Sequence, residues 1–122
     1  MLGSANADYF LYVNNIPAKG ETLQAQKYMT ANGGKGANQA VAAAKLNGNT
    51  TFLGQVGHDE AMFRLKTEME EANVRLQWKV LEKEPTGMAY IYVDKEGENS
   101  IVIYGGANMA FRTLEPDFKA VI

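Results

Sequence analysis

Residues 33–40 read Gly-Gly-Lys-Gly-Ala-Asn-Gln-Ala, which is the most informative run in the sequence. Its three glycines remove side-chain bulk, so backbone N–H groups and the start of a helix can approach a polar ligand closely. Residues 37–46 predict an alanine-rich helix that ends at residues 47–48, Asn-Gly. Asn38 would present its amide from the first turn of that helix. The alternative interpretation is a tight loop that only packs a helix of small residues against a sheet.

The glycine run differs from the two common nucleotide-binding motifs. The phosphate-binding loop requires Gly, four residues, then Gly-Lys and Ser or Thr, whereas Lys35 is followed by Gly36. The dinucleotide fingerprint requires a third glycine where Gln39 stands, and no clear strand runs directly into the loop. The sequence therefore argues against a Walker-type site and against an NAD site.

The elements around this loop are a mixture of strands and helices. Apolar and aromatic runs predict the strands, and Asp59 is a suitable N-cap for a second helix with apolar residues at helical spacing. The predicted strands are residues 9–13, 24–30, 50–56, 86–93 and 99–104, and the predicted helices are residues 37–46 and 59–73. A glycine-containing hairpin loop at residues 94–98 joins the last two strands.

The strand predicted at residues 86–93 is largely apolar on both faces. Its two alternating sets of side chains are Met88, Tyr90, Tyr92 and Ala89, Ile91, Val93. A sheet built from such a strand is expected to be covered on both sides. One cover would be the main domain with its ligand, and the other, by hypothesis, the same sheet of a second subunit.

Asn6 and Asp8 lie two residues apart in a predicted turn after a short first strand, residues 1–2. Open α/β sheets bind ligands at such strand ends, where a carboxylate and an amide can hold vicinal hydroxyls. The alternative is an Asx turn in which these side chains bond to their own backbone. His58, the only histidine, is predicted to be a solvated turn residue without an acidic partner or a catalytic role.

The composition is that of a soluble globular protein. The formal net charge is −2 and no basic cluster occurs, so we expect neither a nucleic acid nor a membrane as a partner. The absence of cysteine excludes disulfides and thiolate metal sites and fits a cytoplasmic location. The short first strand and an amphipathic segment at residues 114–122 lead us to expect a part of a longer α/β protein.

Several motifs together resemble the PfkB-type carbohydrate kinases, in particular their ribokinase-like members. The motifs agree with that family in order and spacing, and the resemblance covers nearly the whole chain. They are residues 3–8 (Gly-Ser-Ala-Asn-Ala-Asp), Pro17, 20–22 (Gly-Glu-Thr), 33–40, 86–89 (Thr-Gly-Met-Ala), 97–99 (Gly-Glu-Asn) and 106–108 (Gly-Ala-Asn).

The resemblance implies a fold class and a sugar site. The fold is α/β, a Rossmann-like ribokinase fold of which residues 1–122 form the N-terminal part, with a small β-sheet lid. Lid strands would fall within residues 9–30 and 86–104, and the α/β core within residues 1–8, 32–80 and 105–122. By the resemblance, sugar hydroxyls are contacted by Asn6, Asp8, Gly34, Lys35 and Asn38, and the apolar side of the sugar by Ala89 and Ile103.

The family's reaction moves the γ-phosphoryl group of ATP to the primary hydroxyl of a sugar, here by implication ribose. The complete enzyme is expected to use ATP and Mg²⁺, with activation by a monovalent cation left open. It is also expected to form a homodimer through the lid sheet.

No catalytic residue is predicted within the chain. The family's catalytic base is an aspartate in a Gly-Ala-Gly-Asp motif, which this chain lacks. By the resemblance, we expect the base to lie beyond Ile122, together with the nucleotide pocket. Residues 1–122 are therefore expected to be inactive and to bind no cofactor.

Two alternatives stay open on the sequence alone. One is a stand-alone module for sugar binding or dimerisation. The other is a kinase of the same family that acts on a different sugar or on a nucleoside.

Overall fold

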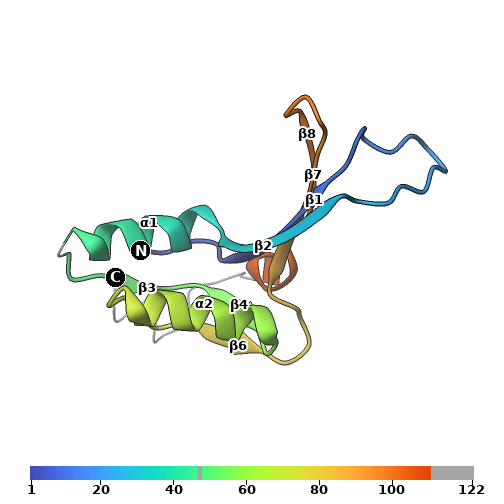
Figure 1. The fold of residues 1–122 in the computed structure, drawn as a ribbon. Helices are drawn as coiled ribbons and strands as arrows, with labels where there is room; N and C mark the ends of the chain where they lie inside the picture. Colours follow the sequence, from blue (N-terminus) through green and yellow to red (C-terminus); the bar gives the residue numbers. More distant parts are fainter. Residues whose placement is uncertain (47, 111–122) are drawn as a thin grey trace.

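The computed structural model describes residues 1–46 and 48–110. A layer of short parallel strands is covered by two helices, and a four-stranded sheet projects from this layer (Figure 1). The amphipathic segment predicted at residues 114–122, which ends at Ile122, lies outside the described residues, as does Asn47 at the predicted end of the first helix. Neither of the two described helices is long and apolar enough to cross a membrane.

The strands of the first layer pair in parallel. They are β3 (Thr51–Phe52) with β5 (Arg75–Leu76), and β4 (Gln55–Gly57) with β6 (Lys79–Leu81). Gln77 N donates to Phe52 O at 3.0 Å and Lys79 N to Gly54 O at 2.9 Å, so the short strands form one continuous ladder. The strand predicted at residues 50–56 is therefore present in two parts, β3 and β4.

The chain start belongs to the same layer. Leu2 forms a parallel bridge with Leu53, and Gly3 N donates to Leu53 O at 3.1 Å. The strands at residues 75–81 were not predicted, although their polar and apolar residues alternate as in a half-buried strand.

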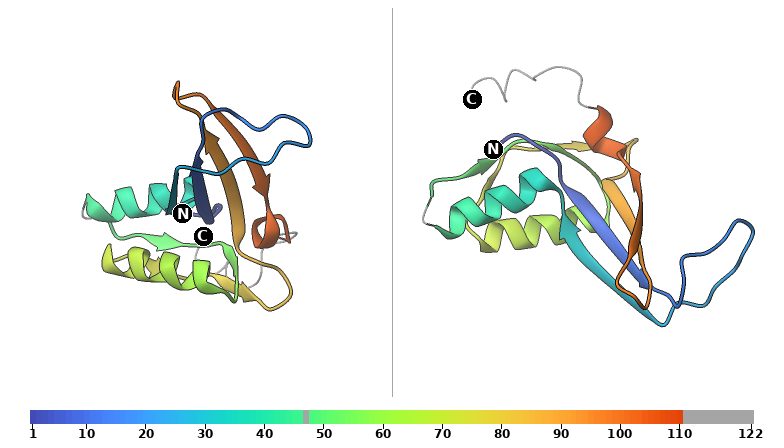
Figure 2. Two further views of the ribbon diagram at one scale, coloured as in Figure 1. Left: turned by 45° about the vertical axis from the view of Figure 1, so that its right-hand side comes forward. Right: turned by 90° about the horizontal axis from the view of Figure 1, so that it is seen from above.

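The two helices α1 (Lys35–Lys45) and α2 (Glu60–Glu71) cover one face of the strand layer (Figure 2). Phe52, Leu65 and Met69 are fully buried in the core between the helices and the strand layer. Burying each such side chain stabilises the fold by about 1.5–3 kcal/mol. α1 begins two residues before its predicted start, and α2 begins directly after Asp59, which is its N-cap as predicted.

The projecting sheet, which we call the lid sheet, has the strand order β2-β1-β7-β8. Its strands are β1 (Asn6–Tyr12), β2 (Lys27–Gly33), β7 (Gly87–Val93) and β8 (Asn99–Tyr104). β1 is parallel to β7, and both outer pairs are antiparallel. The strands of the predicted hairpin at residues 86–104 are confirmed.

Two predicted boundaries in the lid sheet are wrong. Asn6 and Asp8 lie in β1 rather than in a turn, because β1 is paired on both sides from its first residue. The partner strand predicted at residues 24–30 is shifted to β2, since the register pairs Asn6 with Gly33.

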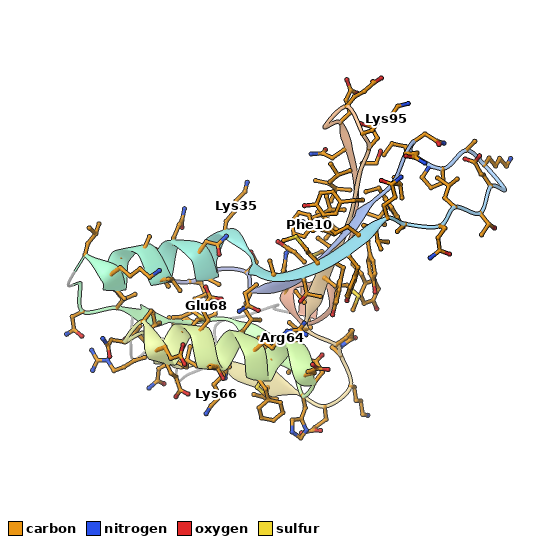
Figure 3. The ribbon with its side chains drawn as sticks, viewed as in Figure 1. Phe10, Lys35, Arg64, Lys66, Glu68 and Lys95 are labelled. Atoms are coloured by element: carbon orange, nitrogen blue, oxygen red, sulfur yellow. The ribbon has the colours of Figure 1, made fainter. Side chains whose placement is uncertain are left out.

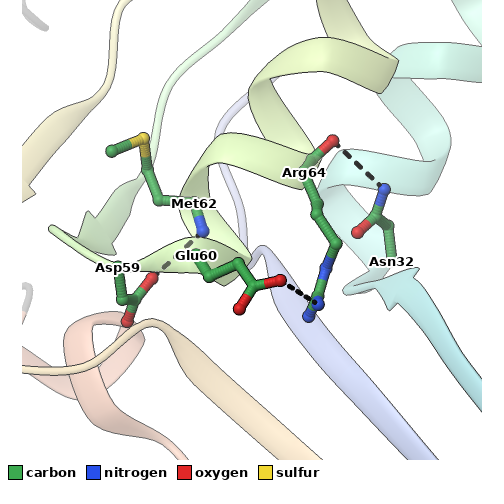
Figure 4. A network of polar contacts seen from close by, with 5 residues as sticks. All are labelled: Asn32, Asp59, Glu60, Met62 and Arg64. Atoms are coloured by element: carbon green, nitrogen blue, oxygen red, sulfur yellow. Dashed lines mark hydrogen bonds and ion pairs between the residues drawn. The ribbon is translucent and has the colours of Figure 1, made fainter.

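Helix α2 also contacts the edge of the lid sheet. Asn32 on β2 donates from Nδ2 to Arg64 O at 3.4 Å and to the carboxylate of Glu68. Figure 4 shows the contact with Arg64, whose guanidinium forms an exposed ion pair with Glu60 at 3.5 Å. These bonds fix the edge strand β2 relative to the helix.

Asp59 joins α2 to the root of β7. Its Oδ1 accepts hydrogen bonds from Met62 N (3.0 Å, Figure 4) and Thr86 Oγ1 (2.7 Å), and its Oδ2 accepts one from Thr86 N (2.9 Å). Burial by itself would raise the pKa of Asp59, but the bonds from Thr86 and Met62, with the charge of Arg64, lower this pKa below its ordinary value.

Replacing Asp59 with Ala is expected to lower the free energy of unfolding by about 1–3 kcal/mol at neutral pH, because the N-cap and the bonds to Thr86 are lost. The ionised carboxylate stabilises the folded chain above the ordinary pKa of 3.8. This stabilisation is lost as the pH falls through the lowered pKa. Urea unfolding at neutral pH and at about pH 2.5 measures the difference, which should shrink in acid.

Glu60→Ala is the matched control for this prediction, since Glu60 is an exposed acidic neighbour. It should change the free energy of unfolding by less than about 0.5 kcal/mol. An Asp59→Ala effect of equal size at both pH values would contradict the assigned role of the carboxylate.

Candidate functional site

One face of the lid sheet brings several predicted site residues into a row. Asp8 on β1 pairs with Ala89 on β7, and Ala89 pairs with Ile103 on β8. Laterally paired residues project to the same face of a sheet, and so does Asn6, two residues before Asp8. We call this the Asp8 face.

The two apolar members of the row differ in exposure. Ala89 is buried at 6% exposure, whereas Ile103 on the edge strand is 67% exposed. An exposed apolar side chain beside polar groups suits a ligand with one apolar side, because binding pockets combine apolar walls with a few polar contacts.

The Asp8 carboxylate lies over the end of β2. A Cβ at Gly33 would collide with both carboxylate oxygens, so the Asp8 carboxylate occupies the space that this glycine leaves open. Asp8 is half-buried, and burial raises its pKa. No residue among those described donates a hydrogen bond to this carboxylate or forms an ion pair with it. It is therefore an acceptor that is free to bind the hydroxyl groups of a ligand.

The glycines after β2 bring the start of α1 against the chain start. Gly34 has a φ of +94°, and a Cβ there would lie 2.5 Å from Ser4 O. A Cβ at Gly36 would lie 2.7 Å from the Cα of Gly3. Ala37 N donates to Ser4 O at 3.0 Å across this contact. The glycine run thus packs the helix tightly, as the alternative interpretation proposed, and it also sets the helix start next to the root of the Asp8 face.

Lys35 and Asn38 lie exposed in the first turn of α1. Figure 3 shows Lys35 projecting into solvent from the start of this helix. The helix has no side-chain cap at its N-terminus and no acidic residue in its first turn. Ala37 N is already bonded to Ser4 O, so among the first backbone N–H groups of α1 those of Lys35 and Gly36 are available to a ligand that carries oxygen atoms.

Asn108 was not predicted to be a site residue. It lies in the 3₁₀ helix η1 (Gly106–Ala110), which follows β8, and its Nδ2 donates to Asn6 Oδ1 at 2.7 Å. The signal for it in the sequence is the Gly-Ala-Asn motif at residues 106–108, one of the motifs that carry the family resemblance. Asn108 also borders a cavity of about 200 Å³ that is lined by Leu2, Gly3, Ser4, Gly54, Gln55 and Asn108.

The prediction that His58 has no acidic partner is wrong. Its Nδ1 lies 3.4 Å from the Glu82 carboxylate. The two side chains are 55% and 76% exposed, so this contact is solvated and contributes little to stability.

The described residues offer no cluster of side chains for a metal ion. Within residues 1–46 and 48–110, no group of three or more His, Cys, Asp or Glu side chains could hold a metal ion. No step of phosphate transfer is therefore assigned to these residues. The arrangement on the Asp8 face can bind and orient a hydroxyl-bearing molecule.

The expected position of the catalytic base, beyond Ile122, stays a prediction. Ile122 itself falls outside the described residues, which end at Ala110.

Comparison with known proteins agrees with this geometry. The family model described as pfkB family carbohydrate kinase matches residues 1–121. A ribokinase of Staphylococcus aureus is 40% identical over 119 residues, which are 96% of this chain and 38% of that protein. A deoxyribokinase of Salmonella typhi is 40% identical over 111 residues, which are 88% of this chain and 36% of that protein.

A solved structure of Arabidopsis thaliana ribokinase, complexed with ribose and ATP, matches with a TM-score of 0.82 at 40% identity. The match covers 88% of this chain and 35% of that one. The chain thus spans 35–38% of the length of these three relatives. The predicted α/β ribokinase fold is confirmed, and the chain belongs to the pfkB family of carbohydrate kinases.

Proposed function

We propose that this chain forms the sugar-binding and lid part of an ATP-dependent carbohydrate kinase whose substrate is ribose. Such a kinase transfers the γ-phosphoryl group of ATP to the primary hydroxyl of ribose and releases ribose 5-phosphate and ADP. The observation that carries the proposal is the half-buried Asp8 carboxylate, held over Gly33 at the root of the lid sheet without a described partner. The similarity to ribokinases, one of them solved with ribose and ATP, supports ribose as the sugar.

In this proposal each site residue has a role that suits its environment. Asp8 accepts hydrogen bonds from sugar hydroxyls, and Asn6 and Asn38 contribute their amides. The backbone at Gly34 and Lys35 approaches the sugar closely, because Gly34 has no side chain to stand between them. Ala89 and Ile103 cover the apolar side of the ring.

The proposed reaction uses ATP and Mg²⁺, and residues 1–46 and 48–110 contain no cluster of His, Cys, Asp or Glu side chains that could hold the metal ion. The chain also lacks the Gly-Ala-Gly-Asp motif that carries the catalytic base in the family. We therefore propose that residues 1–122 bind sugar without phosphorylating it, that a segment beyond Ile122 supplies the base, and that the complete kinase works in the cytoplasm.

The test uses the complete gene product that carries this chain, and residues 1–122 as a separate protein. Each is incubated with ATP, Mg²⁺ and either ribose, 2-deoxyribose or a nucleoside, and ADP formation is measured. We expect ribose-dependent ADP from the complete product and none from residues 1–122. If 2-deoxyribose or a nucleoside is turned over faster than ribose, that compound is the substrate instead of ribose. Sugar binding without any turnover by the complete product would instead favour a binding module.

We also propose that two copies associate through the lid sheet. The edge strand β8 exposes apolar side chains on both faces: Ile101 is 53% and Val102 60% exposed. Ile101 pairs with Ile91 and lies on the Asp8 face, whereas Val102 pairs with Tyr90 on the opposite face. Exposed apolar edge strands favour association, and a second lid sheet would cover this one.

Replacing Ile101 or Val102 with Asp is expected to separate such a dimer, because a charge would be buried in an apolar contact. Light scattering of the complete gene product measures the mass of each variant. The two residues are adjacent and similarly exposed, so each serves as the control for the other. The variant that becomes monomeric identifies the contacting face. A monomeric wild type, or two dimeric variants, would rule out the lid contact.

A further inference from the structure

We propose that Asn108 is a positioning residue that fixes the side-chain amide of Asn6 with its NH₂ group toward the ligand. Asn6 then offers a hydrogen-bond donor beside the acceptor Asp8. This inference rests on the proposed function, because it concerns how the same site distinguishes a hydroxyl from other groups.

The amide orientation of Asn108 is set by the backbone of Ala5. Ala5 N donates to Asn108 Oδ1 at 3.2 Å, and Asn108 Nδ2 donates to Ala5 O at 3.2 Å. A backbone N–H can only donate and a carbonyl can only accept, so a rotated Asn108 amide would lose both bonds. Asn108 Nδ2 must therefore lie on the side of Asn6.

The orientation of Asn6 follows from that of Asn108. Asn108 Nδ2 donates to Asn6 Oδ1 at 2.7 Å, which occupies the oxygen of the Asn6 amide. The Asn6 NH₂ group has no hydrogen-bond partner among the described residues. Asp8 lies two residues after Asn6 on the same face of β1. Its carboxylate likewise has no hydrogen-bond partner among the described residues.

A donor and an acceptor at this spacing are complementary to hydroxyl groups. A hydroxyl oxygen can accept from Asn6 while a hydroxyl hydrogen is donated to Asp8, because each hydroxyl does both. An ammonium group in place of a hydroxyl can donate to Asp8 but cannot accept from Asn6. The pair therefore favours a neutral polyol over its amino analogue at the position that Asn6 contacts.

The lid sheet leaves space for this contact at Gly87. A Cβ there would collide with Asn108 Nδ2 and lie 2.8 Å from Asn6 Oδ1. Gly87 pairs with Asn6 across β1 and β7, so the two amides meet directly above a residue without a side chain. Asn108 follows the last strand of the lid sheet, β8, and thereby holds Asn6 on the first strand, β1.

The test compares Asn108→Asp with the wild-type complete gene product by calorimetry, using ribose and the 2-amino-2-deoxy and 3-amino-3-deoxy analogues of ribose. Asp at position 108 has nearly the same shape but cannot donate, so the Asn6 amide turns to donate to it and presents its oxygen to the ligand. Ribose affinity should fall by about tenfold or more, and one amino analogue should lose markedly less. The preference for ribose over that analogue should therefore decrease or reverse.

Two further variants separate positioning from general damage. In an Asn6→Ala background, Asn108→Asp should no longer change the preference, because the effect passes through Asn6. Asn108→Ala removes the donor without adding a charge and should weaken the preference without reversing it, which keeps the test valid if Asn108→Asp does not fold.

An unchanged preference in both Asn108 variants, with ribose still bound by the wild type, would overturn this inference alone. A wild type that binds neither ribose nor its amino analogues would instead overturn the proposed function.

Discussion

Replacing Asp8 with Asn is expected to weaken ribose binding to the complete gene product by about 10- to 150-fold. A hydrogen bond to a charged group contributes about 1.5–3 kcal/mol, and the half-buried carboxylate has no described partner with which to compensate. The substitution keeps the size of the side chain, so Gly33 still accommodates it. Calorimetry with ribose measures the change in affinity.

The pH dependence of binding gives a second measurement for Asp8. Because burial raises its pKa, this carboxylate takes up a proton at a higher pH than an ordinary aspartate. Ribose affinity should decline as the pH falls through that raised pKa, since the protonated group is a weaker acceptor. In Asp8→Asn this part of the acid dependence should be absent.

Asp94→Asn is the matched control, because Asp94 lies at the far turn of the lid sheet and accepts bonds from Glu96 N and Glu98 N. It should leave ribose affinity within about twofold of the wild type. Asn38→Ala, at the start of α1, should weaken binding by about 1–3 kcal/mol through a lost hydrogen bond. Unchanged affinity in both Asp8→Asn and Asn38→Ala would remove the site assignment.

Replacing Gly34 with Ala is expected to lower the free energy of unfolding by about 3 kcal/mol or more. Its φ of +94° strains any residue with a Cβ, and the new methyl group would meet Ser4 O at 2.5 Å. Relief requires α1 to move away from residues 3–4, which breaks the bond from Ala37 N to Ser4 O. Urea unfolding measures the loss of stability, and ribose affinity should fall with it.

Gly97→Ala is the control that separates the effect of backbone strain from the effect of a steric clash. Gly97 has a similar φ of +82°, but no atom lies within 4 Å of a Cβ built there. This variant should lose only about 1 kcal/mol, the cost of the backbone conformation. Equal losses in the two variants would show that the close approach of α1 to Ser4 does not matter for stability.

Elements with a strong local signal could be predicted from the sequence. α2 begins directly after Asp59 because an aspartate at the N-cap satisfies a free backbone N–H within three residues, which is a local property. The hairpin of β7 and β8 is likewise local, since its turn residues and apolar strands are consecutive. The start of β1 is different: its polar residues resemble a turn, and only pairing with β2 and β7 makes them a strand.

Residue types at close spacing were sufficient to predict the family, the helix after the glycine run, and Asn6 and Asp8 as a candidate pair. The three-dimensional structure was needed to show that Asp8 shares a face with Ala89 and Ile103, and that Asn108 holds Asn6 from 102 positions away. Sheet register and such long-range hydrogen bonds depend on how separate segments pack. No local pattern of residues encodes that packing.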